Sequence, residues 1–189
     1  MVYLYQNPVD LIRHIQEMQH IVAQEIAWIT SVYGLAKLET KEFDGRTVSY
    51  PRVYAGNEEH YDVSPNTEEA GSSFFYINQP LEKVEGRYYR TILNLIVSAN
   101  LKLAKGIDST LFDSVHSLLN QVSKLNLNGN NGLRVSQNAR KIEITSIYFN
   151  QLSTVFPDFN FWNEQERRFR TYPMTCFRIQ YDFSYHNDC

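Results

Sequence analysis

The sequence predicts an α+β fold in which an antiparallel sheet of about four long strands, including a long hairpin, is covered on one face by two helices. Odd positions from Tyr88 to Leu103 are nearly all apolar and even positions are mixed, which is typical of a strand with one buried face. Residues 176–185 alternate in the same way. Two other segments space their apolar residues three and four apart, as amphipathic helices do. We expect the chain to form a single domain, 1–189.

The first helix is predicted over residues 8–30. Asn7 can cap its amino end, and Pro8 suits the first helical position because no needed hydrogen-bond donor is lost there. One apolar stripe runs along this helix and comprises Leu11, Ile15, Met18, Val22, Ile26 and Ile29.

Residues 39–56 predict a hairpin. Asp44 and Gly45 are expected to form its turn, since Asp-Gly suits the two-residue turns that join antiparallel strands. Pro51 cannot donate to a ladder, which predicts that its strand lies at an edge or breaks there. The polar and acidic residues 57–72 then predict a loop.

A short strand at residues 73–78 and a turn at residues 80–86 lead into the long strand Tyr88–Leu103. Sixteen residues at about 3.3 Å each span about 53 Å. A compact chain of this length has a diameter of only about 40 Å. The strand is therefore expected either to bend sharply or to reach another molecule.

The second helix is predicted after Asp108, with Asp108 or Ser109 as its cap. The Asn- and Gly-rich segment Asn126–Asn138 predicts a mobile loop, and Lys141–Phe149 predicts a strand. Residues 150–171 are expected to be irregular or partly helical. The apolar stripe of the second helix comprises Leu111, Val115, Leu118, Val122 and Leu125.

Charge and composition restrict the function classes. Residues 1–70 hold eleven acidic and five basic residues, and residues 71–189 hold ten and thirteen, so the two parts carry net charges of −6 and +3. This polarity suits head-to-tail contact between identical subunits, although an unevenly charged solvated surface is the simpler explanation. The 13 Tyr residues suit either a half-wet sheet or an interface. The charge alone does not indicate nucleic-acid binding.

Cys176 and Cys189 make no disulfide framework and favour folding in a reducing, intracellular site. Neither a signal peptide nor a membrane-spanning segment is predicted. The motifs typical of hydrolases, nucleotide-binding proteins and zinc proteases are missing from the sequence, so we expect no catalytic residue, no metal site and no cofactor. The acidic stretch 58–62 lacks the alternating oxygen ligands of a calcium loop, and a solvated loop is favoured over a cation site.

Arg167, Arg168 and Arg170 enclose an aromatic residue, Phe169. Such a cluster suits contact with phosphates and stacking on a base. It equally suits bidentate pairing with carboxylates of a neighbouring subunit, which is the preferred interpretation. Its expected partners in the acidic part of the chain are Glu58, Glu59, Glu68 and Glu69.

The C-terminal third holds the segment Ile142–Phe156, a polar stretch, the residues Arg170–Met174 and the alternating Phe177–Tyr185. This succession resembles the C-terminal half of tail-terminator and head-to-tail joining proteins of tailed bacteriophages. In that family a helix, an antiparallel sheet with a long hairpin, a second helix and a final strand occur in the order predicted here. Tyr50–Tyr54 and Phe74–Ile77 also resemble structural proteins of Bacteroidetes phages, including the crAss-like group.

The resemblance implies a non-enzymatic virion structural protein at the head–tail junction or the tail end, assembled in the host cytoplasm. It implies as partners further copies of this chain in a closed ring of six or twelve subunits, other phage connector or tail proteins, and genomic DNA that passes the lumen without sequence-specific binding. No membrane partner is implied. The chain departs from the family at residues 57–70 and 126–138, which leaves ring size and partner identity open.

Two functions of other classes also stay open. One is a single-strand nucleic-acid-binding module that uses an aromatic sheet face and the Arg cluster. The other is a small enzyme whose site has no recognisable motif. Steep salt dependence of binding would indicate the nucleic-acid module, and the native mass would separate a ring from both.

Overall fold

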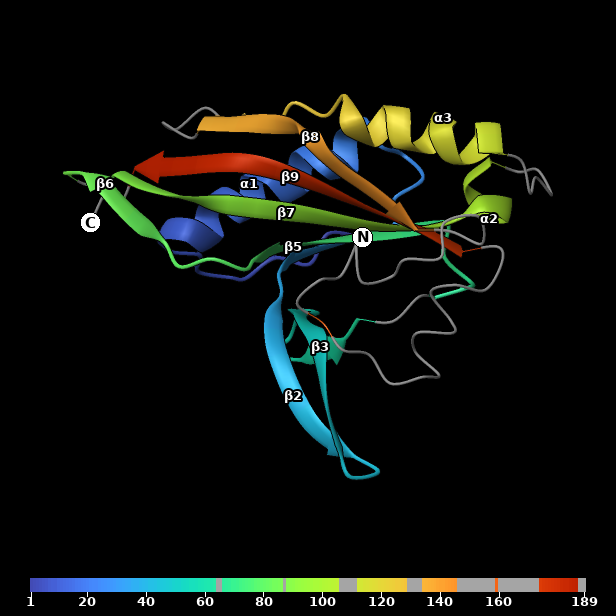
Figure 1. Cartoon of the computed structure of the whole chain (residues 1–189), viewed down its shortest axis with the longest axis horizontal. Helices are drawn as coiled ribbons and strands as arrows, with labels where there is room; N and C mark the ends of the chain where they lie inside the picture. Colours follow the sequence, from blue (N-terminus) through green and yellow to red (C-terminus); the bar gives the residue numbers. More distant parts are fainter. Residues whose placement is uncertain are drawn as a thin grey trace.

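The computed structural model describes residues 1–63, 66–86, 88–105, 112–128, 134–145, 159 and 174–186 (Figure 1). Helices and strands combine in an α+β fold, which confirms the predicted class. The described elements are, in chain order, α1 (Asp10–Glu25), β1 (Ser31–Leu35), β2 (Lys37–Phe43), β3 (Arg46–Tyr54), β4 (His60–Asp62), β5 (Gly71–Ile77), β6 (Glu82–Glu85), β7 (Tyr88–Asn100), α2 (Leu101–Lys105), α3 (Phe112–Ser123), β8 (Arg134–Thr145) and β9 (Met174–His186).

The large sheet has the strand order β1-β5-β7-β9-β8, and β6 pairs with β7 beside this path. Its neighbours are antiparallel except β1 and β5, which are parallel. The predicted purely antiparallel sheet is therefore wrong at one pair. After β1 the chain leaves the sheet, builds a second sheet of β2, β3 and β4, and returns in β5. Parallel neighbours require such a crossover, and here the small sheet provides it.

The small sheet contains the predicted hairpin, with Asp44 and Gly45 between β2 and β3. Both turn residues have positive φ (48° and 72°), as two-residue hairpin turns require. Pro51 lies inside β3, which pairs with β2 on one side and β4 on the other, so both the predicted break and the predicted edge position are wrong. β4 lies inside the segment 57–72, which was expected to be a loop.

β7 is three residues shorter than predicted because Asn100 caps a helix. Its side-chain Oδ1 accepts hydrogen bonds from the amides of Lys102 (3.1 Å) and Leu103 (3.4 Å), which begins α2. β7 is also paired with β9 along its whole length. The strand stays within its own sheet, and the expected reach to another molecule is wrong.

α1 is shorter than the predicted helix at both ends. Val9 precedes it in an extended conformation (φ −119°, ψ 150°) and makes no side-chain cap, so the roles predicted for Asn7 and Pro8 are wrong. Ile26 and Ile29 lie beyond its end and are buried nevertheless. The apolar spacing continues past the helix because these residues pack into the same core.

α3 confirms the second predicted helix, and Val115, Leu118 and Val122 on its apolar stripe are fully buried. The candidate caps Asp108 and Ser109 lie outside the described residues.

β8 begins inside the segment predicted as a mobile loop. Arg134 pairs with Ser184, so residues 134–138 continue the sheet and that part of the prediction is wrong. The ladder with the long β9 outweighs the Asn-rich composition. Residues 150–171 lie outside the described part of the chain, apart from Phe159.

Apolar clusters cover both faces of the large sheet. On one face, the apolar sides of α1 and α3 pack against β7 and β9. On the other face, β3 packs against β5 and β7. The central strands are therefore buried on two faces, where the sequence predicts one. The contacts of β3 on this second face involve Tyr50, Val53, Phe74, Tyr76 and Ile96.

Candidate assembly surface

The β2–β3 hairpin extends away from the large sheet (Figure 1). We call residues 37–50 of this hairpin the arm. All residues from Thr40 to Thr47 are exposed, so both faces of the outer arm meet solvent. Leu38 and Phe43 expose 55% and 40% of their surface. A two-stranded ribbon is only marginally stable in water by itself, so the arm is suited to contact with another surface.

The outer edge of β2 presents a row of backbone groups. The carbonyl of Pro51 accepts a hydrogen bond from the amide of Val63 (2.9 Å), so Pro51 directs its backbone groups away from β2. Because these groups alternate along an antiparallel ladder, Leu38, Thr40 and Glu42 direct theirs away from β3. Among the described strands, β3 alone pairs with β2. The same alternation explains why β3 tolerates Pro51, since the missing donor does not face β2.

The edge of β1 in the large sheet differs from the edge of β2, because the N-terminal segment pairs with it. Val2 forms a parallel bridge with Val32, and the amide of Tyr3 donates to the carbonyl of Val32 (3.1 Å). The N-terminal segment thereby covers one edge. Proteins commonly shield strand edges against unwanted pairing. β2 and β4 are both edge strands of the small sheet, and β2, with seven residues against three, offers the longer edge for pairing.

Charged side chains connect the three strands of the small sheet. Arg52 lies 3.8 Å from Glu39, and Lys41 lies 3.3 Å from Asp62. Hydrogen bonds to Tyr50 and Asp62 raise the pKa of Lys41. Lys41 and Asp62 are exposed and Glu39 and Arg52 are half-buried, and solvent screening makes such surface ion pairs contribute little to stability. They fix the orientation of the arm's charges more than they stabilise the fold.

The four acidic residues expected at an interface lie in two turns. Glu58 and Glu59 are exposed between β3 and β4, and Glu68 is exposed in the turn before β5, where Glu69 is half-buried. The hydroxyl of Tyr61 donates to Glu59 at 2.8 Å, which raises the pKa of Tyr61.

Asparagine side chains hold the second acidic turn. The side-chain amide of Asn66 donates to the carboxylate of Glu69 at 2.9 Å. At the end of β7, the side chain of Asn100 donates to the carbonyl of Thr67 (2.8 Å) and its backbone amide to the carbonyl of Ala70 (2.9 Å). The acidic turn is thus anchored to the large sheet.

A stacked pair of tyrosines joins the N-terminal segment to β1. Tyr3 stacks on Tyr33, with ring centroids 4.6 Å apart. Burial raises the pKa of Tyr33, and the neighbouring Tyr3 and Glu69 add to this effect. Tyr3 also makes a small contribution to the raised pKa of Tyr61, whose hydroxyl donates a hydrogen bond to Glu59. The N-terminal segment also lies near the first acidic turn, because Tyr5 stacks on Tyr54 (4.0 Å), whose hydroxyl accepts a hydrogen bond from the amide of Glu58.

Arg167, Arg168 and Arg170 lie outside the described residues, so the contact expected between this cluster and the acidic turns stays a prediction. The importance of the arm is missed by sequence reasoning. Polar residues predominate at both parities of β2, and this pattern is the signal that could have indicated a ribbon outside the core.

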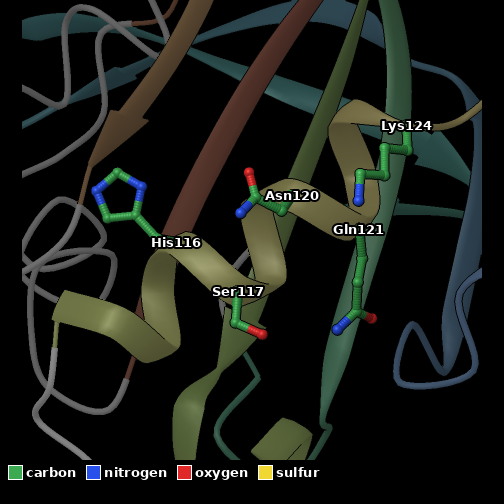
Figure 2. Close-up of a pocket in the computed structure, with 5 residues that line it drawn as sticks. All are labelled: His116, Ser117, Asn120, Gln121 and Lys124. Atoms are coloured by element: carbon green, nitrogen blue, oxygen red, sulfur yellow. The ribbon is translucent and has the colours of Figure 1, made fainter.

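A pocket of about 390 Å³ lies along the outer side of α3. One of its residues, Gln121, accepts a hydrogen bond from the indole of Trp28 at 3.0 Å. The described lining residues include no carboxylate and thus no nucleophile–base–acid arrangement. Figure 2 shows the described lining residues, which come from α3 and the residue that directly follows it: His116, Ser117, Asn120, Gln121 and Lys124.

The buried thiol of Cys176 has no chemical role that its surroundings support. It lies 3.3 Å from the hydroxyl of Ser98, and burial raises its pKa to about 12. A thiol that keeps its proton is a poor nucleophile and a poor metal ligand. Within the described residues, no group of His, Cys, Asp and Glu side chains is placed to hold a metal ion.

No helix among the described elements is long and apolar enough to cross a membrane. Comparison with known proteins yields no match of the chain to a protein-family model, a curated protein or a solved structure.

Proposed function

We propose that this protein is a virion structural subunit that assembles into a closed ring at the head–tail junction or the tail end of a tailed bacteriophage, as a terminator, stopper or connector. The arm carries the proposal. It places exposed apolar and charged side chains on a ribbon outside the core of its own subunit, where a neighbouring subunit can cover them.

Two further features support assembly. The two acidic turns carry part of the negative charge of residues 1–70, with Glu58, Glu59 and Glu68 exposed, which suits head-to-tail contact with a more basic surface. The order of helix, hairpin, long strands, helix and final strand also follows the resemblance to tail-terminator proteins. In this proposal the partners are further copies of the chain, other connector or tail proteins, and DNA that passes through the lumen.

The test is the native mass of the full chain together with a shortened arm. Replacement of Glu42–Thr47 by Asn-Gly keeps Lys41 opposite Val48, and a two-residue turn can join this pair. All replaced residues are exposed, so we expect the melting temperature to stay within a few degrees.

The wild-type chain is expected at the mass of six or twelve subunits, and the shortened arm at a lower mass. A monomeric wild-type chain would contradict the ring. A shortened variant with the same mass as the wild type would show that the arm does not take part in assembly.

A further inference from the structure

The outward-facing backbone groups of β2 are symmetric about Thr40. Leu38 and Glu42 lie two residues to either side, and all three direct their amides and carbonyls away from β3. When two copies of β2 meet antiparallel about a two-fold axis at Thr40, Thr40 faces Thr40 and Leu38 faces Glu42. Each outward amide then meets an outward carbonyl of the other copy.

The charges of β2 are complementary in the same register. Glu39 of one copy falls opposite Lys41 of the other, and the symmetry repeats this pair. An axis one residue away, at Glu39 or at Lys41, sets two identical charges opposite each other. Opposite charges directly across two strands are stabilising and like charges are destabilising. Charge therefore favours the axis at Thr40 over these two neighbouring registers.

We infer that the arm is a self-association surface whose partner is a second copy of this chain. β2 pairs with β2 of that copy about a two-fold axis at Thr40, and the two hairpins form a four-stranded ribbon. Phe43, which is 40% exposed, then lies opposite Lys37 of the second copy, where a cation meets an aromatic ring.

In this arrangement, the ion pairs that already exist within each subunit become connected across the two-fold axis. Glu39 already lies near Arg52, and Lys41 lies near Asp62. Pairing of Glu39 with Lys41 of the second copy links these pairs into one alternating row of charges. The row leaves no like charges adjacent.

This two-fold contact adds to the proposed function and does not depend on it. A two-fold contact uses the same patch on both subunits, whereas a ring closes through head-to-tail contacts between different patches. Arms that pair between two rings of six would give twelve subunits. Without a ring, the arms would give a dimer.

The first test removes one backbone donor at the axis. Thr40→Pro eliminates an amide that faces away from β3, so the hairpin ladder is retained. Ser49→Pro is the matched control, because Ser49 lies opposite Thr40 in the hairpin and directs its amide away from β2. The native mass is measured at about 100 µM, since a strand pair buries less area than a stable interface does. We expect Thr40→Pro to halve the mass and Ser49→Pro to leave it unchanged.

The second test reverses the charges. Glu39→Lys and Lys41→Glu each set like charges across the axis twice, and each should raise the dissociation constant of the two-fold contact about tenfold. The double variant Glu39→Lys/Lys41→Glu restores opposite charges and should restore the mass. Inside one subunit the double variant sets like charges beside Arg52 and Asp62, so a restored mass can arise only between subunits.

The outcomes separate the two proposals. A wild-type mass that Thr40→Pro and both single reversals leave unchanged, or a double variant that stays at half the mass, overturns the two-fold contact. A change between one and two subunits supports the contact and contradicts the ring. A change between six and twelve supports both.

Discussion

At the scale of single residues, Leu95 and Ile179 pair across the central strands and are fully buried on the face that α1 and α3 cover. An aspartate at either position would place an unpaired charge in the core, which costs several kcal/mol and is comparable to the whole stability of a domain. We expect Leu95→Asp and Ile179→Asp to lose cooperative thermal unfolding, measured by circular dichroism. Val84→Asp is the control, because Val84 is 60% exposed. Soluble Leu95→Asp protein that melts cooperatively would contradict this placement.

The buried thiol of Cys176 is expected to make the folded protein less stable at alkaline pH. Burial raises its pKa from 9.0 to about 12 in the folded protein. The unfolded chain therefore releases this proton first, so the thiol's contribution is complete below pH 9 and falls as the pH rises towards 12. Between pH 8.5 and 10.5 we expect the wild type to lose about 2 kcal/mol more than Cys176→Ala in urea unfolding. Cys189→Ala should behave as the wild type, and equal losses in all three proteins would contradict the prediction.

Residue burial was predictable on one face of the sheet and not on the other. The apolar parity of β9 indicated Phe177, Ile179 and Phe183, which are fully buried. Asn94 and Gln180 are also buried, and the Gln180 side chain donates to Asn94 at 2.9 Å. Their burial depends on a partner from a distant part of the chain, and no local pattern carries that information.

At the scale of elements, local chemistry was predictable and long-range pairing was not. The Asp-Gly turn of the arm follows from two adjacent residues and is confirmed. The parallel pairing of β1 with β5 requires knowledge of where the chain returns after the small sheet, so the sequence did not indicate it. The end of β7 was only partly predictable. Asn100 is a good helix cap, which indicates a helix start, but it stands within an otherwise strand-like apolar pattern.

We therefore expect substitutions of Asn100 to lower the free energy of unfolding by different amounts, depending on how many of its interactions they remove. Its Oδ1 caps α2, and its Nδ2 donates to the carbonyl of Thr67. Asn100→Ala loses both interactions and should cost about 2 kcal/mol in urea unfolding. Asn100→Asp keeps the cap, loses the donor and should cost about half as much. Equal losses in the two variants would show that the cap contributes nothing.

At the scale of the whole molecule, the chain divides into a covered body and an exposed arm. The helices and long strands of the body were predictable from the sequence, because their apolar periodicity is strong. The packing of β3 on the second face of the large sheet, while the outer arm meets solvent, was not predictable. That division depends on how the two sheets meet, which residue periodicity within one strand does not encode.

The acidic turns define the last prediction, which concerns assembly. Reversal of Arg167 and Arg168 to Glu should block the ring if this cluster meets the acidic turns of a neighbouring subunit. Exposed pairs are worth about 0–1 kcal/mol each, so the double change is needed for a visible effect. Glu58→Lys/Glu59→Lys is the compensating change, because both residues are exposed, whereas Glu69 is bound by Asn66.

Native mass is the measurement, and the compensating change should restore the ring in the reversed variant. Glu25→Lys/Glu82→Lys is the matched control, since both residues are exposed and belong to α1 and β6 and not to the acidic turns. It changes the net charge by the same amount and should restore nothing. If the cluster instead contacts DNA, the reversed variant keeps its ring and loses DNA retention, and no acid-to-Lys change restores it. Normal assembly of the Arg167→Glu/Arg168→Glu variant would therefore contradict a subunit contact. Normal assembly with reduced DNA retention would show that the arginine cluster binds DNA instead.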